Sequence, residues 1–383
     1  MTSELLANAR LALPTGELRT GWLRVEDGRI VALGEGAAGG PARDLGGAVL
    51  APGFVDVHVH GAAGAEFLDA DAGERAAILR AHARGGTTAL LATTVTASRE
   101  RLRAAVDALA AAEPVDGGAA LLGIHLEGPY LCERHRGAQD PEHLRAPDLA
   151  ELDALLAAGP VRLVTLAPEL PGAPEAIARL VDAGVVASVG HTDATYAQAM
   201  AAFDAGARHA THLFNGMRPF HHREPGVIGA ALDRDDVTCE LICDGEHVAP
   251  AAIRLARRVK GVDRIVLVTD AMSATGLGDG EYRIGALPVT VRGGRAELAG
   301  TGTLAGSTLT MGAAVRNAVR LAGLSLGDAL RMASATPARV LRLEASKGAL
   351  ARGFDADLVV LDDDLAVTAT MVAGAWIVGS LDR

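Results

Sequence analysis

Apolar runs alternate with polar loops and Ala-rich stretches of helical spacing from Pro52 onward. The Ala-rich stretches include residues 98–112, 249–261, 308–322 and 326–334. The apolar runs predict eight strands, at residues 54–60, 87–94, 120–127, 161–167, 185–191, 208–213, 237–243 and 264–270. Strands that alternate with helices pair in parallel, so we expect an α/β fold, a closed (β/α)8 TIM-like barrel over residues 51–344. A doubly wound open sheet is the alternative, because the pattern alone does not prove closure.

Both ends of the chain have a different pattern, in which short alternating strands are joined by turns. These ends are residues 1–50 and 345–383. Two β-rich ends that flank a barrel can pair with each other most simply. We therefore expect a second, small β-sandwich domain built from both termini.

Composition and charge limit the possible partners. The net charge of −11 argues against nucleic acid and anionic membranes, which need a basic surface, so we expect neither as a partner. Three cysteines without a CxxC pair are typical of a reducing compartment. The first residues lack the features of a signal peptide, and no apolar run reaches 18 residues. We expect a cytoplasmic protein.

Polar residues collect at the carboxyl ends of the predicted strands, where barrel enzymes carry their catalytic groups. On the first strand, Asp56, His58 and His60 alternate and therefore lie on one face. Other strands end in His125 and Glu127, in His191, in His212 and Asn215, in Asp244 with His247 after it, and in Asp270. Twelve histidines placed at random would instead be scattered through helices and loops.

Imidazole and carboxylate groups at these positions favour a metal site. Such ligands suit first-row divalent ions, and a catalytic site keeps one coordination position open for water. We expect a divalent ion to be held among Glu127, His191, His212, His58 and His60. Zinc is the first expectation, and iron, manganese and cobalt are alternatives. For the two histidines of the first strand, the alternative is a pair of hydrogen-bonded core residues.

Two aspartates have less certain roles. Asp270 is expected to act as a general base toward metal-bound water, and the alternative is that it satisfies a helix N-terminus. Asp56 is expected to support a ligand rather than to bind the metal itself.

Several motifs resemble known families. The first-strand segment FVDVHVHG, together with His at the ends of strands 5 and 6 and Asp at the end of strand 8, is similar to the amidohydrolase superfamily. More narrowly, seven motifs resemble the N-acetylglucosamine-6-phosphate deacetylases, in order over nearly the whole chain: HLEGPY, VGHTDATY, THLFNGM, REPGVIGA, DGEHV, LVTDAM and GTLAGSTLTM. The resemblance implies a homodimer that hydrolyses the acetamide of N-acetylglucosamine 6-phosphate, in amino-sugar catabolism and cell-wall recycling.

The resemblance also implies residue roles. Glu127, His191 and His212 would be the primary ligands, and Asp270 would be the base and then the acid that protonates the amine. Some relatives lack the His58–His60 pair and hold one metal, so its presence implies a second ion here. Substrate contacts would come from Ala138, Gln139, Asn215, Gly216, Arg223, His247 and Leu304. Of these, Arg223 and His247 would supply positive charge for the 6-phosphate.

Some residues in these loops have alternative explanations. Gln139 stands where some relatives have His; both donate an N–H, so the resemblance implies binding but no proton transfer. Arg223 would otherwise form a surface salt bridge with Glu224. His221 and His222, beside Arg223, either add to the phosphate site or are solvated loop residues. We expect Cys132 to be a free thiol near the pocket rather than a nucleophile.

Three other functions stay open at this stage. One is another amidohydrolase reaction, such as that of a deaminase or a cyclic amidase, which would leave Arg223 and His247 without a role. Another is action on N-acetylgalactosamine 6-phosphate, which the sequence does not separate from the glucosamine epimer. A non-catalytic barrel is disfavoured because no ligand is missing and the strand-8 acid is present.

Overall fold

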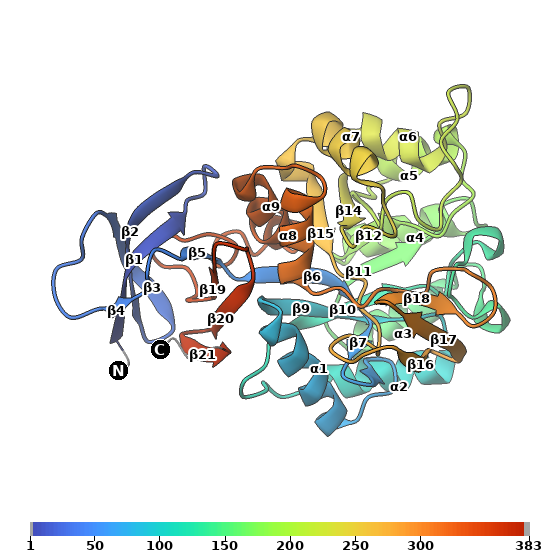
Figure 1. The fold of residues 1–383 in the computed structure, drawn as a ribbon. Helices are drawn as coiled ribbons and strands as arrows, with labels where there is room; N and C mark the ends of the chain where they lie inside the picture. Colours follow the sequence, from blue (N-terminus) through green and yellow to red (C-terminus); the bar gives the residue numbers. More distant parts are fainter. Residues whose placement is uncertain (1–2, 379–383) are drawn as a thin grey trace.

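Eight parallel strands form the barrel in the computed structural model, which describes residues 3–378 (Figure 1). In order around the sheet they are β6 (Phe54–Val59), β9 (Thr87–Thr94), β10 (Ala120–Glu127), β11 (Val161–Leu166), β12 (Val186–Val189), β13 (His209–Ala210), β14 (Thr238–Ile242) and β15 (Ile265–Val268). Each falls within a strand predicted from the sequence. The predicted parallel barrel is confirmed.

The barrel closes between its first strand, β6, and its last strand, β15. The backbone N–H of Asp270 donates to the carbonyl of His58 at 2.9 Å. Asp56 is fully buried on β6, and its carboxylate accepts hydrogen bonds from the hydroxyl of Thr269 at 2.6 Å and from the Thr269 N–H at 3.3 Å. The Asp56 side chain therefore joins the two strands where the backbone ladder is sparse. This seam distinguishes the barrel from an open sheet.

Helices cover the outside of the barrel (Figure 1). They are α1 (Ala72–Arg84), α2 (Arg99–Ala110), α3 (Leu149–Ala158), α4 (Ala173–Asp182), α5 (Tyr196–Asp204), α6 (Gly226–Asp233), α7 (Pro250–Lys260), α8 (Met311–Arg320), α9 (Leu326–Ala333) and α10 (Ala335–Val340). Short 3-10 helices are η1 (Glu133–His135), η2 (Pro141–His143) and η3 (Val262–Arg264). Asp71 and Thr195 begin α1 and α5 with capping boxes, which pair N–H groups that the helices leave free.

A second sheet contains strands from both ends of the chain, as predicted. Its strands are β1 (Ser3–Ala12), β2 (Leu18–Glu26), β3 (Arg29–Glu35), β4 (Arg43–Asp44), β5 (Val49–Pro52), β19 (Leu358–Leu361), β20 (Val367–Val372) and β21 (Ala375–Val378). Strand β19 pairs antiparallel with β5, so the C-terminal segment lies directly beside the N-terminal one. The sheet has its own apolar core, which includes Leu6, Leu23 and Leu358. Residues 379–383 of the predicted C-terminal segment, and residues 1–2, lie outside the described residues.

A three-stranded antiparallel sheet follows β15 and was not predicted. Its strands are β16 (Gly280–Ile284), β17 (Leu287–Arg292) and β18 (Arg295–Leu298). The turn between β16 and β17 is tied to the barrel, because the Gly285 N–H donates to the carboxylate of Glu66 at 2.7 Å. Glu66 belongs to a small hairpin of β7 (Gly61–Ala62) and β8 (Ala65–Glu66) that directly follows the first barrel strand.

Among residues 3–378, no helix has both the length and the apolar character needed to span a bilayer.

Candidate active site

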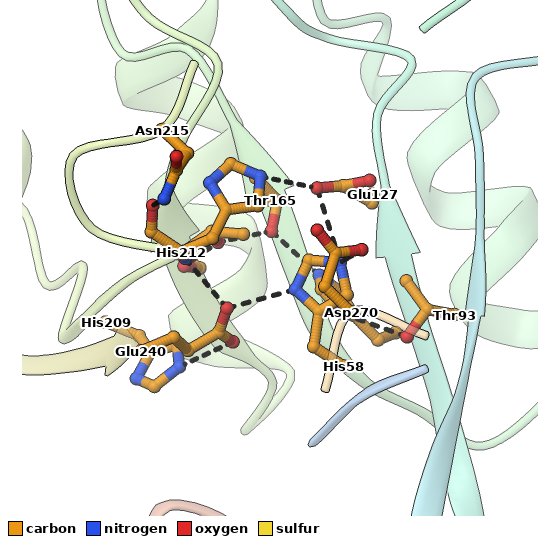
Figure 2. A network of polar contacts seen from close by, with 12 residues as sticks. His58, Thr93, Glu127, Thr165, His209, His212, Asn215, Glu240 and Asp270 are labelled. Atoms are coloured by element: carbon orange, nitrogen blue, oxygen red, sulfur yellow. Dashed lines mark hydrogen bonds and ion pairs between the residues drawn. The ribbon is translucent and has the colours of Figure 1, made fainter. Parts of the chain in front are cut away.

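Four histidines and one glutamate meet where the barrel strands end, and all five were predicted from the sequence. His58 lies on β6 and His60 follows it; Glu127 ends β10; His191 and His212 follow β12 and β13. Their donor atoms form two sets that share Glu127, and the atoms within each set lie within 4.8 Å of one another. All five side chains are buried. Figure 2 shows an oxygen of Glu127 joined by dashed lines to both His212 and His58.

Glu127 lies at the centre of this cluster. Its Oε1 is 3.0 Å from His212 Nε2 and 3.1 Å from His191 Nε2, and its Oε2 is 3.3 Å from His60 Nε2. The Nε2 atoms of His191 and His212 are 3.0 Å apart, and those of His58 and His60 are 3.2 Å apart. One carboxylate therefore reaches both pairs of histidines.

The hydrogen bonding of His191 fits a metal centre. His191 Nδ1 lies 2.9 Å from the carbonyl oxygen of His135, and a carbonyl only accepts, so Nδ1 carries a proton. Whenever this ring is neutral, it therefore points a lone pair on Nε2 at the cluster. Such lone pairs only 3 Å apart repel unless a cation lies between them. The imidazole and carboxylate donors suit a first-row divalent ion.

The electrostatics of the cluster also favour a cation. Burial would lower the pKa of His58, but Glu127, Asp270 and Glu240 outweigh it and hold that pKa well above its usual range. Burial likewise opposes a charge on His60, and hydrogen bonds to Asp270 and Glu127 still raise its pKa to about 9. The carboxylates therefore make the electrostatic potential within the cluster negative, and a negative potential stabilises a positive charge.

Asp270 directly follows β15 and faces the first histidine pair. Its Oδ1 lies 3.1 Å from His60 Nε2 and 3.5 Å from His58 Nε2. Burial alone would raise the pKa of Asp270, but these two imidazoles outweigh burial and hold it below its ordinary value. Among the described contacts, the carboxylate has no helix N–H as a partner, which argues against the capping alternative. Asp270 is an ionised carboxylate beside the cluster.

Three of these residues have backbone conformations that side chains rarely adopt. The φ angles are 47° at His191, 31° at His212 and 51° at Asp270. Such conformations cost on the order of 1–3 kcal/mol each, and they persist where the surrounding structure imposes them. Each lies just past the end of a barrel strand, so the strand aims the side chain into the cluster rather than along the barrel wall.

A cavity of about 230 Å³ opens onto the cluster. Six of the seven predicted substrate contacts line it: Ala138, Gln139, Asn215, Gly216, His247 and Leu304. Ile284, at the end of β16, and Thr303 also line it, although the sequence analysis did not single them out. The unpredicted sheet therefore contributes one wall of the cavity. An alternating pattern with glycine turns at residues 285 and 293–294 could have indicated this sheet.

Arg223 is the predicted contact that the structure does not bring to the cavity. It is exposed, and its guanidinium contacts His222 Nε2 at 2.9 Å. Among the described ion pairs none joins it to Glu224, whose carboxylate instead accepts from the Tyr196 N–H. The same loop exposes Phe220, which is 56% accessible. Within one chain, the residues that line the cavity include no arginine or lysine.

His247 lines the cavity and belongs to neither donor set of the cluster. Its Nδ1 lies 2.5 Å from Oδ2 of Asp244. Burial would lower the pKa of His247, but the hydrogen bond and charge of Asp244 outweigh burial and raise it. The imidazole therefore keeps its positive charge to a higher pH than an isolated histidine.

Gln139 contacts the cluster more closely than the sequence analysis anticipated. Its amide oxygen accepts from the Thr96 N–H at 2.7 Å, which orients the amide so that Nε2 donates to Glu127 at 2.5 Å. In the neighbouring loop, burial raises the pKa of the Cys132 thiol. A thiol that stays protonated is a poor nucleophile, as expected for this residue.

Sequence reasoning missed Glu240, a fully buried residue on β14. Burial would raise the pKa of Glu240, but the imidazoles of His58 and His209 outweigh it and hold that pKa well below its usual range. The available signal was a lone glutamate inside the apolar run CELIC. Asp56, by contrast, accepts hydrogen bonds from the backbone N–H groups of His58 and Thr269 at the seam, and it belongs to neither donor set.

Residues 49–377 match the model of the amidohydrolase family. The chain belongs to this family. The amidohydrolase is 42% identical over 376 residues to an N-acetylgalactosamine-6-phosphate deacetylase of Escherichia coli O157:H7, covering 97% of this chain and 98% of the relative. It is 39% identical over 382 residues to an N-acetylglucosamine-6-phosphate deacetylase of Bacillus subtilis (strain 168), covering 97% and 96%.

A solved structure is similar to this amidohydrolase over nearly its full length. It is an aspartate-to-alanine variant of N-acetyl-D-glucosamine-6-phosphate deacetylase from Mycobacterium smegmatis, in complex with N-acetyl-D-glucosamine-6-phosphate. The TM-score is 0.93 at 48% identity, and the match covers 99% of this chain and 100% of that one. The family resemblance stated from the sequence motifs is confirmed.

Proposed function

We propose that this amidohydrolase is a metal-dependent deacetylase of N-acetylglucosamine 6-phosphate, and that it releases acetate and glucosamine 6-phosphate. One observation carries the proposal: an ionised aspartate, Asp270, lies 3.1 Å from a cluster able to hold metal, at the base of a cavity. The two relatives and the solved structure described above, each of which matches nearly the full chain, are hexosamine-6-phosphate deacetylases. The disfavoured non-catalytic barrel would have no use for this arrangement.

Zinc or another first-row ion would be held by the two sets that share Glu127, one or two ions per subunit. When bound, such an ion lowers the pKa of its water from roughly 15.7 to roughly 7 and polarises a carbonyl oxygen. Zinc is the ion we propose, and iron, manganese and cobalt would suit the same donors.

Asp270 moves the proton in this mechanism. As a carboxylate it takes a proton from the attacking water while the water oxygen bonds to the acetyl carbon. Asp270 is then a carboxylic acid, and it gives the proton to the sugar nitrogen as the carbon–nitrogen bond breaks. The immediate products are acetic acid and an amine, and transfer of the remaining proton from the acid to the amine gives acetate and an ammonium group. Gln139, Asn215 and Leu304 would hold the substrate in the cavity around this aspartate.

For the phosphate group, we propose that His247 acts together with Arg223 of a second copy of the chain in a homodimer. An arginine suits a phosphate because its planar fork donates two parallel hydrogen bonds. Two observations support a second copy: Arg223 is exposed and away from its own cavity, and Phe220 beside it is also exposed. His221 and His222 would flank the same phosphate.

N-acetylgalactosamine 6-phosphate is the second candidate substrate, which the E. coli relative favours. The deciding experiment measures acetate release from both 6-phosphates, with phosphate-free N-acetylglucosamine as the control and with elemental analysis of the protein. We expect the glucosamine epimer to be hydrolysed fastest. Equal rates without phosphate would contradict the assigned phosphate site and favour a different amidohydrolase reaction, such as that of a deaminase or cyclic amidase.

A cytoplasmic location is also proposed. Three cysteines without disulfides support it, because thiols persist in reducing compartments.

A further inference from the structure

Each histidine pair of the cluster has one ring anchored by a hydrogen bond, and the two pairs differ in whether the acceptor is a main-chain or a side-chain group. A metal-binding ring keeps its orientation when its other nitrogen donates to a fixed acceptor. In the second pair, His191 donates from Nδ1 to the carbonyl of His135. In the first pair, His58 Nδ1 lies 3.0 Å from Oε2 of Glu240. The Nδ1 atoms of His60 and His212 have no hydrogen-bond partner among the described residues. Each pair thus has one anchored ring.

Glu240 is the anchor of the first pair, and three hydrogen-bonding groups contact its carboxylate. A carboxylate only accepts hydrogen bonds, so His58 Nδ1 must carry its proton and direct the Nε2 lone pair at the cluster. The other oxygen, Oε1, lies 3.0 Å from His209 Nε2, and the backbone N–H of His212 donates to Oε2 at 2.9 Å. Figure 2 shows Glu240 between His209 and His58, on the far side of His58 from Glu127.

The consequences of losing this carboxylate differ between the two pairs. Without it, neither ring of the His58–His60 pair would keep an Nδ1 acceptor among the contacts described. The His191–His212 pair would keep the His135 carbonyl, which is main chain and unaffected by a side-chain change at residue 240. His212 would lose one backbone hydrogen bond but no ring contact.

We propose that Glu240 is a positioning residue that fixes the tautomer and orientation of His58, and thereby controls binding of the ion held by His58 and His60. The ion held by His191 and His212 does not depend on it. This inference rests on the metal centre of the proposed function, but it concerns ion binding and needs no substrate.

The test compares ion binding in the wild type, Glu240→Leu and Glu151→Leu. Leucine has a volume similar to that of glutamate but accepts no hydrogen bond, so it leaves His58 Nδ1 without its acceptor. Glu151 is a matched control because it is also a buried carboxylate, paired with Arg145 at 2.5 Å on α3, outside the cluster. Metal-free proteins are titrated with zinc, and the two dissociation constants are measured by chelator competition, with elemental analysis at each plateau. His60→Asn identifies which constant belongs to the first pair.

We expect two ions in the wild type and in Glu151→Leu. In Glu240→Leu, the ion of the first pair should bind about 10- to 100-fold more weakly, with the other constant unchanged. Two ions at wild-type affinity, or equal weakening of both, would overturn the proposal, since a general loss of structure weakens both sites. If the leucine variant does not fold, Glu240→Asp replaces it, because its shorter carboxylate cannot span His58 and His209. Selective weakening of the first-pair ion supports the proposal, and two unchanged constants contradict it.

The same data separate this inference from the proposed function. Selective loss of one ion in a protein that hydrolyses no acetylated sugar phosphate would support the role of Glu240 and refute the deacetylase. If the protein hydrolyses the acetylated sugar phosphate but its ion binding does not change with residue 240, the deacetylase is supported and the role of Glu240 is refuted.

Discussion

Gln139 Nε2 donates a hydrogen bond to Oε2 of Glu127 at 2.5 Å, so a residue predicted to touch substrate also holds the carboxylate that both histidine pairs share. The amide is oriented by the Thr96 N–H, which leaves its second hydrogen free for a substrate oxygen. Substrate binding and ligand orientation are thus coupled at one side chain.

Replacing Gln139 with leucine should therefore weaken metal binding as well as substrate binding. A hydrogen bond to a charged group is worth about 1.5–3 kcal/mol, which corresponds to roughly 10- to 100-fold in affinity. The measurement is the zinc dissociation constant beside kcat and KM. Gln139→His is the control, because histidine can also donate an N–H to Glu127. A leucine variant with unchanged zinc affinity would show that Glu127 needs no such support.

Asp270→Asn should separate chemistry from metal binding. Asparagine cannot take the proton from water, so kcat should fall by about 10²- to 10⁴-fold, the usual contribution of a positioned acid–base group. Metal content by elemental analysis should stay close to that of the wild type, since the five donors are unchanged. Retained turnover in this variant would remove Asp270 from the mechanism.

Asp244 sets the pH range over which His247 can attract a phosphate. Because Asp244 raises the pKa of His247, the imidazolium is present below that raised pKa and is lost as the pH rises through it. We expect KM for the 6-phosphate to increase with pH in that range. Asp244→Asn should move the increase to lower pH.

The control for this pH dependence is the phosphate-free sugar. Its KM should not follow the His247 titration in either protein. An unchanged profile for the 6-phosphate in Asp244→Asn would separate His247 from phosphate binding.

The homodimer proposal predicts complementation between two variants that are each impaired in a different way. In Arg223→Ala, KM for the 6-phosphate should rise by about 10- to 100-fold, as for loss of a charged hydrogen bond, while kcat changes little. Co-expression with Asp270→Asn allows mixed dimers in which one site has both Asp270 of its own chain and Arg223 of the second copy. Activity at low substrate concentration should then exceed the sum of the separate variants. No gain in mixed dimers, with mixing verified by two affinity tags, would place Arg223 elsewhere.

The sequence was sufficient for the barrel and for the cluster of four histidines and a glutamate, because each has a signal along the chain. His58 and His60 interrupt an apolar strand with period two, and Glu127, His191 and His212 end or follow other apolar runs. Strand position alone therefore predicts that these side chains converge.

Other features depend on contacts that have no such signal. Glu240 lies in the middle of β14, and only the closed barrel shows that it reaches His58 on β6. The sheet of β16, β17 and β18 lies within a loop of the repeating βα pattern, so the contribution of Ile284 to the cavity was missed. The place of Arg223 cannot be predicted because its proposed partner is a second molecule. Features that repeat along the chain can be predicted from the sequence, whereas contacts between distant residues are seen only in the structure.

The pairing of β19 with β5 makes the segment from Leu358 onward necessary for maturation. Strand β5 leads directly into β6, the strand of His58, and one edge of β5 is occupied by a strand that the ribosome makes only after the whole barrel. A nascent chain that ends before Leu358 would hold every proposed ligand yet leave that edge open to other chains. Premature stop codons in this last stretch should thus yield aggregates rather than weak enzyme, which expression of such truncations would reveal.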